Sequence, residues 1–331
     1  MHKVALVLGK FLDFHVGHEH LIRFAQTKAE KVIVLLCKGE NDRRPVGQRY
    51  VWIRETFGNT IDLVEFDYAA EAGLDGGEES DRGISEAWAK YVDEKYPEVD
   101  IIVGSEDYVR YMADYGDFEF ELFDIDREQF PCSSTSVNAG AFDFRSEASK
   151  FDLVKPVVFL GPESTGKTTA ARLIGEELGL NVVFEAARKL MRPDGTFSIH
   201  DLDQFALQQQ FDINESIKYA DSDKIIVDSS AFTTIVYSNM QFDTLSTSVA
   251  ALLGVEIEKR YNYIIFAPDV DWIDDGTRYM SDLADRMDFY TTLIYIMDMY
   301  NLPYRVVAGH NYDERVELAK QIILSGEYEN A

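Results

Sequence analysis

Cysteine, long apolar runs and basic side chains are all scarce in this 331-residue sequence. The two cysteines, Cys37 and Cys132, are too few for a disulfide framework or a cysteine-based zinc site. Both lie beside apolar residues, so we expect buried free thiols. No segment approaches the roughly 18 to 20 uninterrupted apolar residues of a membrane-spanning helix. The opening residues, MHKVALVLGK, lack the apolar core and cleavage site of a signal peptide, so we expect a cytoplasmic protein with no membrane partner.

Acidic residues greatly outnumber basic ones, with 59 Asp and Glu against 32 Lys and Arg and a net charge of −27. Binding to DNA or RNA depends largely on neutralising phosphates, so we expect no nucleic-acid partner. A small anion such as ATP can still bind where basic side chains and main-chain amides are concentrated locally. The content of 46% hydrophobic and 27% charged residues is typical of a folded globular protein, and the length suits two domains.

Short apolar runs alternate with helix-period segments, which is typical of α/β folds with parallel sheets. In the first half we expect strands at 4–9, 31–37, 61–67, 100–105 and 118–126, and helices at 19–29, 48–57, 84–96 and 107–115. In the second half we expect strands at 154–161, 181–185, 224–228, 261–268 and 304–308, and helices at 167–178, 200–220, 281–300 and 312–325. The stretch 138–155 is irregular, so the predicted domains are 1–150 and 151–331, each with its own parallel sheet.

A phosphate-binding loop is the strongest motif. The pattern G-x-x-x-x-G-K-T follows an apolar strand and opens an amphipathic helix, which is the context that such a P-loop requires. Glycines let the backbone curl and aim its N–H groups at phosphate oxygens, and the helix N-terminus favours the same negative charge. Lys167 is expected to reach the β- and γ-phosphates, and the Thr168 hydroxyl to bind Mg²⁺. The expected ATP-binding residues here are Gly161, Pro162, Glu163, Ser164, Thr165, Gly166, Lys167, Thr168 and Thr169.

Further along the second half, Asp228 ends an apolar strand, where a P-loop enzyme needs an acidic residue for Mg²⁺ or for the attacking hydroxyl. A helix-capping aspartate is the alternative. Arg278 and Arg286 lie in a polar, glycine-containing stretch before a helix, a pattern typical of a segment that closes over ATP and brings guanidinium groups to the transferred phosphoryl group. Ordinary surface arginines are the alternative for either residue alone.

A histidine motif follows the first strand. His15, Gly17 and His18 form H-x-G-H at a predicted helix start, where ligands bind at the carboxyl ends of parallel strands. The imidazoles can donate hydrogen bonds to phosphate oxygens, and the glycine lets a nucleotide approach the backbone. Structural histidines or a metal site are alternatives, although no third metal ligand is evident nearby.

Together these motifs resemble the NadR-like family, bifunctional enzymes with nicotinamide mononucleotide (NMN) adenylyltransferase and ribosylnicotinamide kinase domains. In the first half the resemblance rests on GKF at 9–11, H-x-G-H at 15–18, the helix around Arg49 and Trp52, VGSEDYVRYM at 103–112, and Arg127 before PCSSTSVN at 131–138. In the second half it rests on the P-loop, FEAAR at 184–188, IIVDSS at 225–230 and W-x-x-D-G-x-R-x₇-R at 272–286. The resemblance covers nearly the whole chain in the same domain order.

This resemblance implies a Rossmann-like nucleotidyltransferase followed by a P-loop kinase, both using ATP with Mg²⁺. The kinase would convert nicotinamide riboside to NMN, and the nucleotidyltransferase would convert NMN to NAD and pyrophosphate. Glu185, Arg188 and Asp228 would lie at the riboside or phosphate site, and Thr168 and Asp228 would hold Mg²⁺. The implied ATP-binding residues of the first domain are Gly9, Lys10, Phe11, His15, Gly17, His18, Arg127, Ser133, Ser134 and Thr135. The implied catalytic residues are His15, His18, Lys167, Asp228, Arg278 and Arg286.

Three positions depart from the family pattern. Asn138 replaces the arginine of the I-S-x-T-x-I-R signature, which removes a positive charge near the triphosphate; Arg43, Arg44 and Arg145 are possible substitutes. Ser230 replaces the second carboxylate of the D-T-D that often ends the kinase strand. The aromatic residue that would stack on nicotinamide is not clearly placed, and Trp88 is the candidate, with an ordinary core tryptophan as the alternative.

These departures leave two alternatives open: a kinase with a degenerate first domain, and a non-catalytic nucleotide sensor. The DNA-binding domain that precedes some family members is not expected. The oligomeric state, a homo-oligomer included, and the preference between nicotinamide and nicotinic acid substrates are left open.

Overall fold

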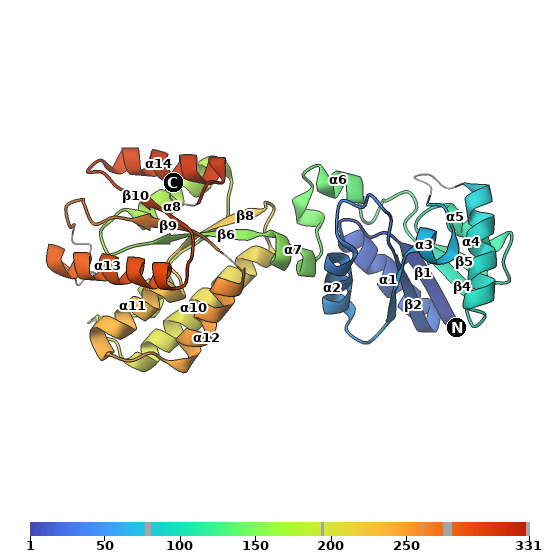
Figure 1. Cartoon of the computed structure of the whole chain (residues 1–331), viewed down its shortest axis with the longest axis horizontal. Coiled ribbons are helices and arrows are strands. Elements are labelled where there is room, and N and C mark those ends of the chain that lie inside the picture. Colours follow the sequence, from blue (N-terminus) through green and yellow to red (C-terminus); the bar gives the residue numbers. More distant parts are fainter. Residues whose placement is uncertain (77–80, 193–194, 260, 274–279, 329–331) are drawn as a thin grey trace. The chain divides into compact units, whose positions relative to one another are not determined.

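The computed structural model describes residues 1–76, 81–192, 195–259, 261–273 and 280–328. The chain divides into two compact units, Met1–Asp152 and Leu153–Ala331, and each is built on a five-stranded parallel sheet (Figure 1). The α/β class with two parallel sheets, predicted from the alternating pattern, is therefore confirmed. Among the described residues, no helix has the length and apolar character to span a membrane.

In the N-terminal unit the strand order is β3-β2-β1-β4-β5. The strands are β1 (His2–Gly9), β2 (Ala29–Cys37), β3 (Asp62–Phe66), β4 (Ile101–Gly104) and β5 (Glu119–Leu122). The central strands are continuous apolar runs because helices cover both faces of the sheet. All five predicted strands form, although β5 is shorter than expected.

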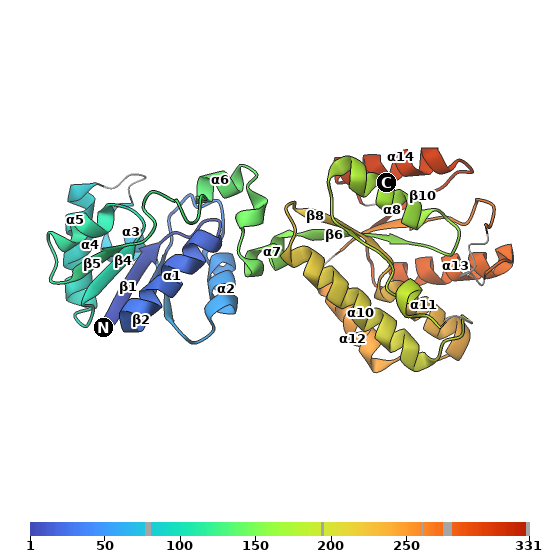
Figure 2. The ribbon, with the colours of Figure 1, turned by 180° about the vertical axis from the view of Figure 1, so that it is seen from behind.

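The helices of this unit follow the strands in turn. They are α1 (Val16–Lys28), α2 (Val46–Phe57), α3 (Tyr68–Ala72), α4 (Arg82–Lys95), α5 (Tyr108–Ala113), α6 (Ser134–Asn138), the 3₁₀ turn η1 (Phe142–Phe144) and α7 (Glu147–Leu153). Helices α4 and α5 pack on one face of the sheet through a core that includes Trp88 and Met112, and α1 and α2 lie on the other face (Figure 2).

In the C-terminal unit the strand order is β10-β9-β6-β8-β7. The strands are β6 (Lys155–Leu160), β7 (Val182–Val183), β8 (Lys224–Asp228), β9 (Asn262–Phe266) and β10 (Tyr304–Val307). The helices are α8 (Lys167–Leu178), α9 (Ala187–Leu190), α10 (Ile199–Lys218), α11 (Ala231–Phe242), α12 (Thr247–Lys259), α13 (Leu283–Met299) and α14 (Tyr312–Ser325). Helices α8 and α14 cover one face of the sheet, and α10 to α13 lie on the other (Figure 1).

The two helices between β8 and β9 are absent from the sequence prediction. Helix α11 is buried along most of its length, so it lacks the alternation of apolar and polar faces that marks a surface helix. It also begins at Ala231, only a short turn after the end of β8 at Asp228. Helix α12 packs against α10 and α11, so its apolar positions face other helices rather than the sheet.

Both sheets have a topological switch point at a motif. Strand β1 lies between β2 and β4, and β6 lies between β8 and β9. Ligands of open α/β sheets bind outside the carboxyl ends of the strands at such points. The H-x-G-H motif follows β1 and the P-loop follows β6, so each occupies the expected ligand-binding edge of its unit.

Candidate active sites

The P-loop adopts a tight curl between β6 and α8. Gly161 has φ of +131°, and a Cβ atom there would lie 2.4 Å from the carbonyl oxygen of Phe266 on the neighbouring strand. Gly166, with φ of +89°, forms the N-cap of α8. Both positions require glycine, because a side chain would be strained at either backbone angle and would collide with β9 at the first. The loop therefore leaves the N-terminus of α8 open to an anion.

Lys167, Thr168 and Asp228 meet at the base of this loop. The Lys167 ammonium donates to the carbonyl oxygens of Gly161 and Pro162, each at 2.8 Å. The Thr168 hydroxyl donates to Asp228 Oδ2 at 2.6 Å. Burial lowers the pKa of Lys167, and the carboxylate of Asp228 opposes that shift. The lysine thus lies beside the curl, held by main-chain oxygens.

A magnesium ion fits these residues. Asp228 is fully buried, and its Oδ1 atom has no hydrogen-bond partner in the described part of the chain. Burial also raises the pKa of this carboxyl group, against the attraction of Lys167. Mg²⁺ in nucleotide sites is usually held by one or two protein oxygens together with phosphates and water. A hydroxyl and a carboxylate oxygen at this position match that donor set.

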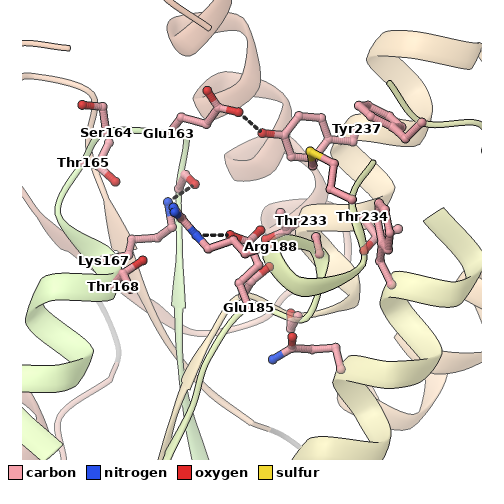
Figure 3. Close-up of a pocket in the computed structure, with 18 of the residues that line it drawn as sticks. Glu163, Ser164, Thr165, Lys167, Thr168, Glu185, Arg188, Thr233, Thr234 and Tyr237 are labelled. Carbon is pink, nitrogen blue, oxygen red and sulfur yellow. Dashed lines mark hydrogen bonds and ion pairs between the residues drawn. The ribbon is translucent and has the colours of Figure 1, made fainter. Parts of the chain in front are cut away.

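A cavity of about 290 Å³ opens beside the loop. Figure 3 shows the P-loop side chains on one side of it and Thr233, Thr234 and Tyr237 of α11 on the other, with Glu185 and Arg188 between them. The remaining lining includes Phe197, Phe205 and Gln209. A mixed apolar and polar pocket of this size suits a nucleoside or similar small molecule.

Glu185 and Arg188 lie in this cavity as an ion pair. Arg188 Nε donates to Glu185 Oε2 at 3.2 Å. Burial raises the pKa of Glu185, and the nearby Asp228 carboxylate raises it further. Two carboxyl groups close to one lysine and one arginine form a site that can bind hydroxyl groups and phosphate oxygens in the same pocket.

Glu163 links the P-loop to other elements. The Tyr237 hydroxyl donates to Glu163 Oε1 at 3.0 Å (Figure 3). The main-chain N–H of Met280 donates to Glu163 Oε2 at 3.1 Å. The side chain of Ser164 accepts a hydrogen bond of 2.7 Å from the N–H of Ile273. These contacts fix the loop against α11 and against residues on both sides of the segment 274–279.

The structure describes only one of the two arginines of the predicted closing segment. Arg278 lies outside the described residues. Arg286 lies near the start of α13, is 4% exposed, and donates from Nη1 to the carbonyl oxygen of Val270 at 3.0 Å. It is not among the residues that line the cavity. In this structure its guanidinium group therefore bonds to the main chain after β9.

A carboxylate absent from the sequence prediction lies beside the end of β8. Glu256 of α12 is 1% exposed, and its Oε1 accepts a hydrogen bond of 2.8 Å from the N–H of Ala231. Burial raises the pKa of Glu256 to about 7, and the hydrogen bond from Ala231 opposes that rise. Ser230, where the family pattern has a carboxylate, is the N-cap of α11. The buried carboxyl group of Glu256, which comes from α12, therefore binds the main chain of Ala231, one residue after Ser230.

In the N-terminal unit, His15 and His18 stack at the start of α1. Their ring centroids are 3.6 Å apart, and the main-chain N–H of His18 donates to His15 Nδ1 at 3.4 Å. An accepting Nδ1 leaves the proton of a neutral imidazole on Nε2, where it can donate to a phosphate oxygen. Burial lowers the pKa of His15 to about 4, helped by the positive charge of Arg127. Burial also lowers the pKa of His18, and the electrostatic effect of His15 lowers it further.

Some of the other predicted nucleotide-binding residues of this unit lie next to the histidines. The Phe11 ring meets His18 edge-on at 5.0 Å. The Ser133 side chain caps α6 by accepting from the N–H of Ser136. Cys132 Sγ lies 3.4 Å from His15 Nδ1, so this thiol contacts the histidine motif. The sequence alone predicted only that the thiol is buried. A Cβ at Gly17 would lie 3.1 Å from the His15 ring, which explains the glycine between the histidines.

Lys10 and Arg127 are at the edge of this group. Lys10 Nζ lies 3.8 Å from Asp42 Oδ1. The side chain of Arg127 is 46% exposed and forms an ion pair of 3.8 Å with Glu106. Trp88 lies elsewhere, because it is 6% exposed in the sheet core and donates from Nε1 to the carbonyl oxygen of Asp75. Its ring fills the core of the sheet, as expected for the alternative of an ordinary core tryptophan. We therefore do not assign Trp88 to a nicotinamide site.

Comparison with known proteins supports the motif-based resemblance. Residues 156–315 match the AAA domain family. The trifunctional NAD biosynthesis/regulator protein NadR of Escherichia coli (strain K12) is 26% identical over 361 residues, which cover 97% of this chain and 83% of that protein. Two solved NadR structures, one in complex with NAD and AMP-PNP and one in complex with NR, align with TM-scores of 0.58. They are 16% and 17% identical, and each alignment covers 100% of this chain and 98% of the other. The resemblance of this chain to the NadR-like family is thereby confirmed along nearly its whole length.

Proposed function

We propose that the chain carries out two successive steps of NAD synthesis. The C-terminal unit transfers the γ-phosphoryl group of ATP to the 5′-hydroxyl of nicotinamide riboside, giving NMN and ADP. The N-terminal unit transfers the adenylyl group of a second ATP to NMN, giving NAD and pyrophosphate. The observation that carries this proposal is a phosphate-binding motif at the switch point of each sheet, in a chain similar to NadR along 97% of its length.

In the kinase step, the 5′-oxygen of the riboside forms a bond to the γ-phosphorus as the bond to the β–γ bridging oxygen breaks. The hydroxyl proton passes to the carboxylate of Asp228, whose Oδ1 has no hydrogen-bond partner among the described residues. Lys167 turns from its main-chain partners to the β- and γ-phosphates. Glu185 and Arg188 hold the riboside or its new phosphate. Thr168 and Asp228 would hold Mg²⁺, which would neutralise phosphate charge.

In the adenylyl step, an oxygen of the NMN phosphate forms a bond to the α-phosphorus of ATP, and the bond to the β-phosphate oxygen breaks. The attacking oxygen is already ionised, so no base is needed. The chain contributes alignment and stabilisation of the leaving pyrophosphate. His15 and His18 donate hydrogen bonds as neutral imidazoles, and Ser133, Ser134 and Thr135 add hydroxyl and main-chain donors at the start of α6.

A single reaction tests both steps. The purified chain is incubated with radiolabelled nicotinamide riboside, ATP and Mg²⁺, and riboside, NMN and NAD are resolved over time. The proposal predicts that label moves from riboside through NMN to NAD, with ADP and pyrophosphate formed. A chain that leaves the riboside unchanged is not this enzyme.

One observation favours a second candidate, a kinase with an inactive N-terminal unit. Asn138, at the C-terminal end of α6, lies where the family signature has arginine, so the signature cation is absent. In the same reaction this candidate predicts that label accumulates in NMN and never reaches NAD. Supplying unlabelled NMN and labelled ATP separates the two candidates without relying on the kinase step.

A further inference from the structure

Three arginines converge on a single buried aspartate next to the histidine motif. Asp13 is fully buried, two residues before His15. Its Oδ2 accepts from Arg43 Nε at 2.7 Å, and its Oδ1 accepts from Arg44 Nε at 3.3 Å and from Arg145 Nη1 at 3.1 Å. We call these four residues the Asp13 cluster. The sequence separates its first and last members by 132 positions, so only the fold brings them together.

The loop between β2 and α2 holds two of the arginines in place. Asp42 accepts from the fully buried Arg49 at 2.7 Å and also from the N–H of Gly39 at 2.8 Å, which fixes the loop just before Arg43 and Arg44. Both arginines then turn toward Asp13, and their side chains are 35% and 26% exposed. Each can therefore reach Asp13 and an anion at the surface together.

The third arginine is tied to the histidine motif itself. Arg145 follows η1 and forms a backbone bridge with His15. Its side chain is 6% exposed and lies over the ring of Phe142 at 5.0 Å. Its Nε has no hydrogen-bond partner among the described atoms. A buried guanidinium group with an open donor is therefore fixed beside His15.

The charges of this cluster do not balance. Among the described ion pairs, one carboxylate faces three guanidinium groups. Burial acts to raise the pKa of Asp13, but hydrogen bonds from Arg43 and Arg145 outweigh it and lower that pKa, so the carboxylate stays ionised. Because His15 is neutral near pH 7, positive charge next to the motif comes from arginine. A strongly acidic chain that retains such an excess has a local site for an anion.

We propose that Asp13 is a positioning residue that holds Arg43, Arg44 and Arg145 as a binding site for the polyphosphate end of a nucleotide, and that Arg145 supplies the cation absent at Asn138. The proposal rests on the adenylyl transfer proposed above for this unit. The main-chain oxygen of Ser134 accepts from Arg43 Nη2 at 2.8 Å, which brings the cluster to the same serine-threonine segment that precedes Asn138. The ligand class is pyrophosphate, free as product or as part of ATP.

The test compares Arg145→Gln, Arg145→Lys and Asp13→Asn in the full chain, with NMN and ATP as substrates. We expect Arg145→Gln to lower kcat/KM for ATP at least about tenfold, because a charge-assisted contact to the leaving group is lost. Arg145→Lys should recover part of that loss. Asp13→Asn should also lower kcat/KM about tenfold although it makes the site more positive, since the arginines lose their anchor. A rise in activity with Asp13→Asn would overturn the positioning role.

Pyrophosphate binding gives a second readout that a purely structural role would not change. It is measured by calorimetry in the Lys167→Ala background, so that the P-loop contributes little. Arg145→Gln should weaken binding about tenfold, whereas Arg82→Gln, which breaks an exposed pair with Asp114 in the same unit, should leave it unchanged. Thermal unfolding followed by circular dichroism, compared with the unmodified chain, checks that the N-terminal unit of each variant is folded.

These readouts separate the two proposals. If the unmodified chain forms no NAD from NMN, the proposed adenylyl transfer fails, and the calorimetry alone then decides whether the Asp13 cluster binds pyrophosphate. If NAD forms and Arg145→Gln changes neither kcat/KM nor pyrophosphate affinity, the proposed function stands and the role of the cluster is wrong.

Discussion

The two units collect their proposed phosphate-binding groups from the chain in different ways. In the C-terminal unit, the curl, the lysine and the threonine all come from residues 161–168, and Asp228 is added from β8, which lies beside β6 in the sheet. In the N-terminal unit, histidines, arginines and hydroxyl groups come from separate segments, and Asp13 binds three arginines at once. A contiguous loop relies on backbone geometry, whereas a dispersed site relies on buried ion pairs. Both concentrate positive potential in a chain with a net charge of −27.

Removing the P-loop lysine should produce the largest change and should affect one unit only. We expect Lys167→Ala to lower riboside phosphorylation about a thousandfold, because the main cation on the β- and γ-phosphates is lost. NAD formation from added NMN should stay within about twofold of the unmodified chain. The matched control is Lys224→Ala, whose ammonium pairs with Asp223 on the same unit. A parallel loss of both activities would break the comparison between units.

The reciprocal change is His18→Ala in the N-terminal unit. NAD formation from NMN should fall about a hundredfold, since one phosphate donor at the start of α1 is removed. Riboside phosphorylation, measured as ADP release, should not change. His20→Ala is the control. His20 lies two residues after the motif, is exposed, and stacks on Phe130. Equal effects of the two substitutions would argue against a specific role for His18.

Stability should depend on pH through Glu256 of the C-terminal unit. Its pKa is raised to about 7 from an ordinary value of 4.5, so the folded state binds the proton more tightly than the unfolded state. Stability of this unit should therefore fall as the pH rises from about 4.5 to 7 and level off above. The loss is on the order of 2 to 3 kcal/mol. Urea unfolding at pH 5 and pH 8 measures it.

Glu256→Gln should remove most of this dependence and should be the more stable protein at pH 8. The exposed Glu258→Gln on the same helix is the control and should keep the dependence. If Glu256→Gln and the unmodified chain lose stability equally between pH 5 and pH 8, another group is responsible.

The smallest expected effect is on the pH dependence of NAD formation. Because burial lowers the pKa of His15 to about 4, the imidazole is already neutral throughout the range from pH 6 to 8. We expect kcat/KM for ATP in the adenylyl step to be nearly flat in that range. If kcat/KM instead fell as the pH rose through the ordinary histidine value of about 6.5, a protonated histidine would be the form that binds the nucleotide.

The sequence predicted the sheets and the P-loop because both are encoded locally. Buried parallel strands such as β1 and β6 are continuous apolar runs, and the P-loop motif is eight residues with a fixed geometry. Helix α11 was missed because burial on all sides removes its periodic pattern. The Asp13 cluster could not be predicted from the sequence for another reason. Arg145 and Asp13 are far apart in the chain, and only the folded structure shows that they pair. Arg43, Arg44 and Arg145 could be named as candidates, but Asp13 could not.

The most direct test of two separate phosphate sites is a mixture of the Lys167→Ala and His18→Ala proteins with labelled riboside, ATP and Mg²⁺. Neither protein alone should produce appreciable NAD from riboside. Together they should form NAD, since NMN made by the P-loop of one protein can be adenylylated by the histidine site of the other. A mixture that consumes riboside and accumulates NMN without NAD would contradict the account.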